Sequence, residues 1–238
     1  MNLVWTIAKK ELSSFFDSLV AYILLVAFLG FSGFFTWLYG ADIFFRSQAD
    51  LKVFFSVAFW TLFFFIPALT MRMIAEEKKS GTIELLLTKA ITGRQLVLGK
   101  FIACLLMVGI ALAFTLPYYY TISTMGNVDH GATISGYAGL LLMSAAYIGI
   151  GLFASSVTGN QIVAFLLALL IGIFFHFIFG ILSQGLSGTV GEVLSTLSLS
   201  AHYESVTRGV LDSKDLIYFL SITFFGLFLS EKNLTEQS

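Results

Sequence analysis

Two short segments carry the residue types of a serine nucleophile and its base. Gly30-Phe-Ser-Gly33 has the pattern found around the nucleophile of intramembrane serine proteases, and His176 is a candidate base within an apolar run. Nucleophilic catalysis requires the hydroxyl and the imidazole in hydrogen-bond contact, beside an oxyanion site. A second match, Gly185-Leu-Ser-Gly188, shows how readily a chain rich in Gly and Ser produces this pattern by chance. We therefore rank proteolysis below other functions and expect His176 to be neutral and bonded to a hydroxyl or a backbone carbonyl.

Another segment resembles a phosphate-binding loop but does not meet its requirements. Such a loop needs Gly-x-x-x-x-Gly-Lys-Ser/Thr after a strand. From Gly93 to Gly99-Lys100 there is one residue too many, and Phe101 stands where the metal-binding hydroxyl belongs. We therefore expect no ATP site and no catalytic residue in this chain.

A metal site is equally weakly indicated. Three side chains with metal-binding groups occur in one polar stretch: His202, Glu204 and Asp212. Their spacing lacks the close pairs typical of structural and catalytic metal sites. We expect neither a metal nor another cofactor to be bound by this chain.

The composition indicates whether the surface of the protein faces water or lipid. The chain has 238 residues, of which 58% are hydrophobic and 11% charged, whereas a soluble domain has about 25% charged residues. Too few charges remain to cover a water-facing surface, which excludes an ordinary soluble enzyme and a disordered chain. The formal net charge of −1 gives no basic field that would attract nucleic acid. The sequence predicts a polytopic membrane protein.

Six apolar segments could cross a bilayer as helices. A crossing helix needs roughly 20 mostly apolar residues, and these segments are too long for the alternating strands of a barrel. The predicted spans, none of which contains Asp, Glu, Lys or Arg, are 19–39, 53–71, 101–122, 134–157, 162–182 and 216–230. The last has only 15 residues, but we expect it to cross. The predicted fold class is therefore all-α, with six transmembrane helices.

Positive charges orient these spans, because cytoplasmic loops carry an excess of Lys and Arg. With the N-terminus inside, nine positive residues are cytoplasmic: Lys9, Lys10, Arg72, Lys78, Lys79, Lys89, Arg94, Lys100 and Lys232. Four lie outside: Arg46, Lys52, Arg208 and Lys214. Both termini are therefore predicted to be cytoplasmic. Residues 1–17 form an amphipathic pattern, with Trp5 and Phe15 on the apolar face, which predicts an interfacial helix lying on the lipid bilayer.

The loop at residues 72–100 concentrates the charge of the chain. It holds nine of the 27 charged residues, and the charges next to span two suggest that this helix continues into the cytoplasm. Ser80 or Thr82 could cap a short helix, and Gly93 is expected to end it. The apolar triplet at 85–87, bracketed by charges, suits contact with a partner, although an ordinary basic loop without a partner would show the same charges.

The run Glu77-Lys-Lys-Ser-Gly-Thr-Ile-Glu-Leu-Leu-Leu-Thr88, followed by Gly99-Lys100, resembles the permeases of ABC-2-type transporters. Within that family, the sequence is most similar to permeases associated with gliding motility. The resemblance covers the whole chain in order, as one domain of residues 1–238: an elbow helix at 1–17, six spans, and the stretch from His202 to Asp212 before the sixth span.

The resemblance implies a permease subunit, not itself an enzyme, of an ATP-driven exporter in the bacterial cytoplasmic (inner) membrane. A separate ABC ATPase subunit would bind ATP and Mg, and a second permease subunit, identical or related, would complete a dimer. The coupling helix that docks into the ATPase would span residues 82–92. The residues implied in coupling are Thr82, Ile83, Glu84, Leu85, Leu86, Leu87, Lys89 and Arg94.

Two further groups of residues are expected to matter outside that loop. The resemblance implies that the outer segment 183–215 re-enters the membrane, with His202, Glu204 and Arg208 on it; Glu204 and Arg208 could form an i,i+4 ion pair. Phe55, Phe59 and Phe63 lie on one helical stripe of span two. This stripe could line a dimer interface or a hydrophobic pathway, or could simply be a packed or lipid-facing aromatic surface.

A second function remains open from the sequence. A permease associated with gliding motility could be a mechanical or scaffolding module, in which the ATPase drives conformational work without transport of a solute. A wide cavity between paired protomers would favour transport, and a sealed interface would favour mechanical work.

Overall fold

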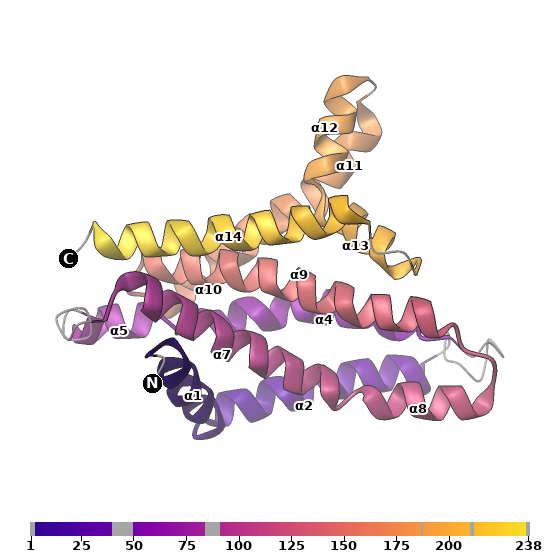
Figure 1. The fold of residues 1–238 in the computed structure, drawn as a ribbon, viewed down its shortest axis with the longest axis horizontal. Coiled ribbons are helices and arrows are strands. Elements are labelled where there is room, and N and C mark those ends of the chain that lie inside the picture. Colours follow the sequence, from indigo (N-terminus) through magenta and orange to yellow (C-terminus); the bar gives the residue numbers. More distant parts are fainter. Residues whose placement is uncertain (1–2, 40–49, 84–90, 187, 210–211, 237–238) are drawn as a thin grey trace.

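The computed structural model describes residues 3–39, 50–83, 91–186, 188–209 and 212–236. Within these ranges every regular element is a helix and there is no strand (Figure 1). The all-α prediction is confirmed.

Six helical segments are long and apolar enough to cross a membrane, as predicted. Several are built from consecutive shorter helices. In chain order they are α2 (Leu19–Trp37), α4 (Lys52–Thr70) with α5 (Ala75–Lys79), α7 (Gly93–Ala113) with α8 (Leu116–Met125), α9 (His130–Val157), α10 (Gln161–Ile173) with η1 (Phe174–Ile178) and α11 (Phe179–Gly185), and α14 (Ser213–Thr235).

The sixth span is longer than its apolar run predicts. Helix α14 has 23 residues, because polar residues extend it at both ends. Asp212 is its N-cap, and the Lys214 backbone N–H donates to the Asp212 carboxylate at 3.1 Å. This bond holds the pKa of Asp212 below its ordinary value. At the rise of an α-helix, 23 residues extend about 34 Å, enough to cross the hydrocarbon core.

The third span begins earlier than predicted and is divided in two. Thr92 caps α7 in a capping box with Gln95, so Gly93 begins this helix and does not end the preceding one as expected. The strong N-cap outweighs the weak helix propensity of the glycine. The helix ends at Ala113, and Pro117 lies in the first turn of α8, where its missing N–H removes no intrahelical bond.

Helix α9 is the centre of the bundle. It packs against α4, α7, α10, α13 (Leu199–Thr207) and α14. Two of these contacts require glycine: a Cβ on Gly226 would lie 2.5 Å from the Gly149 carbonyl carbon, and a Cβ on Gly151 would lie 2.1 Å from the Thr70 hydroxyl. These glycines therefore allow α9 to approach α14 and α4 closely, as small residues do in other membrane helix packings.

Different elements lie at the two ends of the bundle (Figure 1). The two ends of the described chain, α5 and the start of α7 lie together at one end; the turn from α8 to α9 and helix α13 lie at the other. Helices α11 and α12 (Thr189–Leu197) form a hairpin that projects sideways from the bundle. The cytoplasmic location of the first end and the re-entry of the outer segment stay predictions.

The N-terminal segment is a helix, α1 (Leu3–Phe16), that packs against the start of α7. Ala8 and Phe15 are buried, and Ile7 lies so close to Gly99 that a Cβ there would be 2.6 Å from the Ile7 side chain. Trp5 is 55% exposed and is free to face lipid head groups. The interfacial position of the helix stays a prediction.

Candidate functional site

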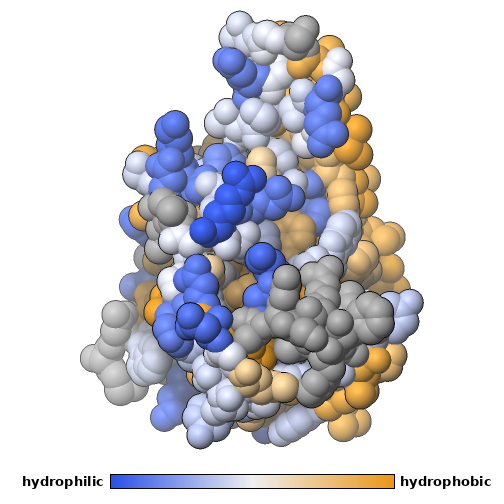
Figure 2. Space-filling model, turned by 90° about the vertical axis from the view of Figure 1, so that its right-hand side faces the viewer, coloured by the Kyte–Doolittle hydropathy of each residue, from blue (hydrophilic) through white to orange (hydrophobic). Residues whose placement is uncertain are grey.

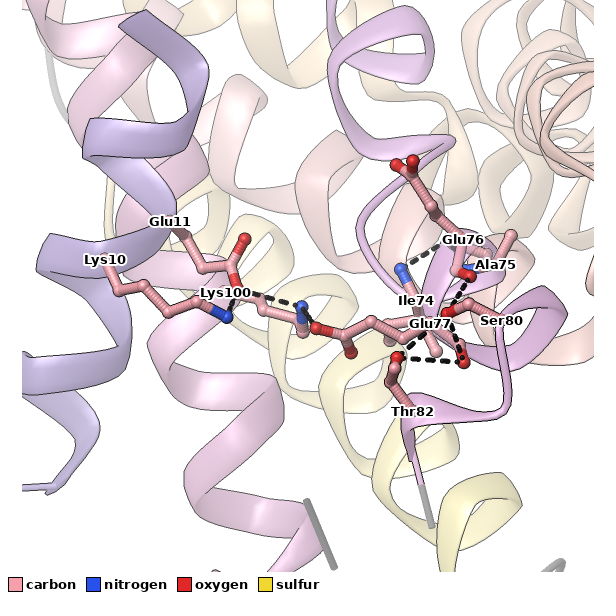
Figure 3. A network of polar contacts seen from close by, with 10 residues as sticks. Lys10, Glu11, Ile74, Ala75, Glu76, Glu77, Ser80, Thr82 and Lys100 are labelled. Atoms are coloured by element: carbon pink, nitrogen blue, oxygen red, sulfur yellow. Dashed lines mark hydrogen bonds and ion pairs between the residues drawn. The ribbon is translucent and has the colours of Figure 1, made fainter. Parts of the chain in front are cut away.

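A buried lysine joins three helices at the end of the bundle that carries the chain termini. Lys100 of α7 is 1% exposed, and its Nζ lies 2.7 Å from Glu77 Oε1 of α5 and 3.2 Å from Glu11 Oε1 of α1 (Figure 3). We call Glu11, Glu77 and Lys100 the Lys100 clamp. A buried ammonium is costly unless it is paired and hydrogen-bonded, so the clamp fixes the positions of all three helices relative to one another.

The acidic groups of the clamp outnumber its single basic group. Two carboxylates share one ammonium, and the second oxygen of Glu77 is buried without a hydrogen-bond partner among the described residues. Lys10 lies 3.7 Å from Glu11 but is largely exposed. A cavity of about 640 Å³ opens beside the clamp, between α1 and the segment from Arg72 to Thr82. Glu11, Glu77 and Lys100 line this cavity, so it opens directly beside the clamp.

A serine of α9 holds the joint between α4 and α5. The backbone N–H groups of Ile74 and Ala75 each donate to Ser155 Oγ at 3.0 Å, and Ser155 donates to the Met71 carbonyl at 3.0 Å. One side chain therefore satisfies three backbone groups that the interruption of the helix leaves free. The joint is a fixed element, attached to the central helix of the bundle.

The charged loop leaves α5 through a tight turn. Gly81 has a φ of +69°, a conformation that favours glycine just after a helix. Ser80 Oγ donates to the Glu76 carbonyl at 2.9 Å and Thr82 Oγ1 donates to that of Glu77 at 3.3 Å. Both hydroxyls, which the sequence suggested as N-caps of the next helix, bond to the end of α5.

The predicted coupling residues are only partly within the described structure. Thr82 is exposed, Ile83 is half-buried against the core, and Arg94 is exposed at the start of α7. Glu84, Leu85, Leu86, Leu87 and Lys89 lie outside the described residues. The coupling role of all eight therefore stays a prediction, but both ends of the loop emerge from helices held by the Lys100 clamp.

The predicted outer residues have separate partners. His202 Nδ1 lies 2.6 Å from Asp215 Oδ1, and its Nε2 lies 2.9 Å from the Thr196 carbonyl. Through these two contacts, His202 ties α13 to α14 and to α12. In the part of the chain that the structure describes, Glu204 and Arg208 make no ion pair with each other; both line a cavity of about 540 Å³ at this end.

The aromatic stripe of α4 lies inside the protomer. Phe55, Phe59 and Phe63 are 7%, 8% and 2% exposed. Phe59 stacks on His176, with ring centroids 4.3 Å apart, and on Tyr203 at 4.5 Å. Burial raises the pKa of the Tyr203 phenol, which therefore stays neutral. A role of the stripe in a pathway or a dimer interface stays a prediction.

The candidate protease pair does not come together. Ser32 donates to the Leu29 carbonyl within its own helix, at 3.3 Å, whereas His176 Nδ1 lies 2.6 Å from the Tyr147 hydroxyl. The hydroxyl partner expected for His176 is confirmed. With the serine and the histidine bonded to different groups, this arrangement cannot activate a nucleophile.

Comparison with known families settles the class of the protein. A family model described as ABC-2 family transporter protein matches residues 5–229. The chain belongs to the ABC-2 transporter family. It is therefore a membrane component of a transporter and not itself a catalyst. Among individual curated proteins, none matches the chain.

The sequence predictions for this ABC-2 permease give no polar contact to three residues that the structure joins to other helices. Lys100 was predicted only as a loop residue, Glu11 had no assigned role, and Ser155 lay within an apolar span. The first two carried a usable signal, because opposite charges at the boundary of the membrane need partners. Ser155 carried none: a serine in an apolar helix usually bonds its own backbone.

Proposed function

We propose that this chain is the permease subunit of an ATP-driven ABC-2 exporter of the bacterial inner membrane. A separate ATPase subunit would bind ATP and Mg and would dock on the segment from Thr82 to Thr92. A second permease subunit, identical or related, would complete the membrane domain. The resemblance of the loop to permeases associated with gliding motility extends the proposal to that process.

The observation that carries the coupling proposal is the connection of the loop to the bundle. At its start, the loop leaves α5, which is attached to α9 through Ser155 and to α1 and α7 through the Lys100 clamp. At its end, it enters α7, which carries Lys100 itself. A force applied to the loop would therefore move α4, α7 and α1 together, because all three are joined by buried polar contacts.

The proposal is tested by uncoupling the loop from the ATPase. We expect Glu84→Ala or Leu86→Asp to lower ATP hydrolysis by the complex purified through the tagged chain at least tenfold, because the first removes a charge and the second an apolar anchor of the docking surface. Membrane insertion, measured by protease protection, should be unchanged. Lys232→Gln, an exposed change at the same end of the bundle, is the matched control.

The result also separates the two functions that the sequence left open. Full ATP hydrolysis and full partner binding by both loop variants would contradict the docking role. If the wild-type complex hydrolyses ATP but moves no solute in proteoliposomes, the chain is a mechanical module and the export part of the proposal is wrong.

A further inference from the structure

The end of the bundle opposite the Lys100 clamp contains a cavity whose lining changes from charged to aromatic. The cavity has a volume of about 540 Å³ and lies between α4, η1 and α13, within the range of small-ligand sites. Lys52, at the first position of α4, lines its charged part; Phe59 and Trp60, two turns further along the same helix, line its aromatic part. The two parts are separated by about 12 Å along the helix axis.

Figure 2 shows the end of the molecule near this cavity. Hydrophilic side chains gather over the centre of this face, and hydrophobic ones cover its right-hand flank.

The charged part contains two opposite charges that do not neutralise each other. Glu204 and Arg208 are one turn apart on the same side of the cavity, yet within the described residues neither makes an ion pair. Lys52 is partly neutralised by Asp50, at 3.6 Å. Among the described residues, the lining thus offers one exposed guanidinium and one exposed carboxylate that make no ion pair. These groups would bind an anion and an ammonium group side by side.

The aromatic part contains a polar atom without a partner. His176 is 2% exposed and lines the cavity, and its Nε2 makes no hydrogen bond within the described structure. If the Tyr147 hydroxyl donates to His176 Nδ1, the hydroxyl and Nδ1 each have a hydrogen-bond partner. The one N–H proton of the neutral imidazole is then on Nε2. A buried N–H without an acceptor is costly. Nε2 is buried behind the lining, so an ester or amide carbonyl of a ligand that displaced the neighbouring rings would stabilise it.

We infer that this cavity binds a zwitterionic amphiphile: a phosphate or carboxylate at Arg208, a primary ammonium group at Glu204, and an apolar body against Phe59 and Trp60, with a carbonyl near His176. Such a molecule could be a phospholipid of the bilayer, such as phosphatidylethanolamine, or a ligand on its way out of the membrane. The inference does not rest on the ATPase partner.

The test measures lipid binding by the full-length chain in detergent, without ATP. Delipidated protein is titrated with phosphatidylethanolamine, phosphatidylglycerol or phosphatidylcholine of the same acyl chains, and complexes are counted by native mass spectrometry. We expect saturable binding of one phosphatidylethanolamine per chain, about tenfold tighter than of the other two. Phosphatidylglycerol lacks the ammonium group, and the quaternary group of phosphatidylcholine cannot donate a hydrogen bond to Glu204.

Substitutions assign the binding to this cavity. Arg208→Gln and Glu204→Gln each keep the shape of the lining and should weaken phosphatidylethanolamine binding about five- to tenfold. His176→Phe should also weaken this binding, although it keeps an aromatic ring at the position. Glu192→Gln and Lys214→Gln, exposed changes on the same outer segment, should have no effect. Equal binding of the three lipids, or unchanged binding by both Arg208→Gln and Glu204→Gln, would overturn the inference.

Native mass spectrometry of protein extracted without delipidation shows where the ligand comes from. One phosphatidylethanolamine per chain in that sample identifies a resident lipid, whereas a cavity that is empty there and fills with the added lipid identifies a readily exchanged ligand; both results support the site. Because binding is measured without ATP, a failure here and a failure of ATPase coupling are separate results.

Discussion

Lys100 is the residue on which the coupling end of the molecule depends most. Its ammonium group is buried between two carboxylates that come from helices 89 and 23 residues away in the sequence. A buried ion pair of this kind adds little net stability to the fold. Removing one partner nevertheless destabilises the fold strongly, because the remaining charges stay buried without a counter-charge. Its role is to fix α1, α5 and α7 in one arrangement.

Replacement of this lysine should therefore be severe. We expect Lys100→Met to lower the free energy of unfolding in detergent by about 3–5 kcal/mol, because Glu11 and Glu77 are left buried beside each other. Thermal unfolding followed by tryptophan fluorescence measures the change. Lys10→Gln, which removes an exposed partner of Glu11, should cost less than about 1 kcal/mol.

The triple variant Glu11→Gln, Glu77→Gln, Lys100→Met separates charge from packing. It should recover most of the lost stability, because no unpaired charge remains. If Lys100→Met were as stable as Lys10→Gln, the clamp would have no structural role.

At the scale of the elements, the contact between α9 and α14 defines the sixth span. The two backbones meet at Gly149 and Gly226: a Cβ on Gly226 would lie 2.5 Å from the Gly149 carbonyl carbon, and a Cβ on Gly149 would lie 3.1 Å from the Thr223 carbonyl oxygen. This packing orders a helix whose apolar run is only 15 residues long. The length of α14 is thus decided by its neighbours and its cap as much as by its own hydropathy.

Gly226→Ala tests this contact. The added methyl group would collide with backbone atoms, which cannot rotate away, so we expect the two helices to separate at a cost of about 1–3 kcal/mol. Gly109→Ala is the control, because a Cβ there has no neighbour within 4 Å and alanine favours a helix by about 1 kcal/mol over glycine. Equal melting temperatures for the two variants would show that α14 does not depend on this packing.

The whole molecule can be oriented with single cysteines. The chain has one cysteine, Cys104, which is fully buried, so cysteines introduced elsewhere can be labelled without removing it. We expect a membrane-impermeant maleimide to label Asn127→Cys from outside the cell and Glu236→Cys only after permeabilisation, because six crossings return the chain to its starting side. External labelling of Glu236→Cys would show that α14 does not cross.

The sequence predicted the features that depend on local pattern. Long apolar runs locate all six spans, because the cost of exposing backbone polar groups to lipid leaves helices as the only solution. The extra length of α14 and the start of α7 were not predicted, because caps such as Asp212 and Thr92 extend helices through polar residues. The Lys100 clamp and the Ser155 joint were also missed, since they join residues distant in the sequence and depend on the packing of the whole bundle.

The central claim is that the loop between α5 and α7 contacts an ATP-binding subunit. It is tested most directly by a photoreactive amino acid placed at Leu86 in the tagged chain, in membranes of the native cell. The account predicts a covalent adduct with a nucleotide-binding polypeptide at Leu86, and none from the same probe at Lys232 on the same side of the membrane. A purified complex that hydrolyses ATP but gives no adduct at Leu86, or equal adducts at both positions, would contradict it.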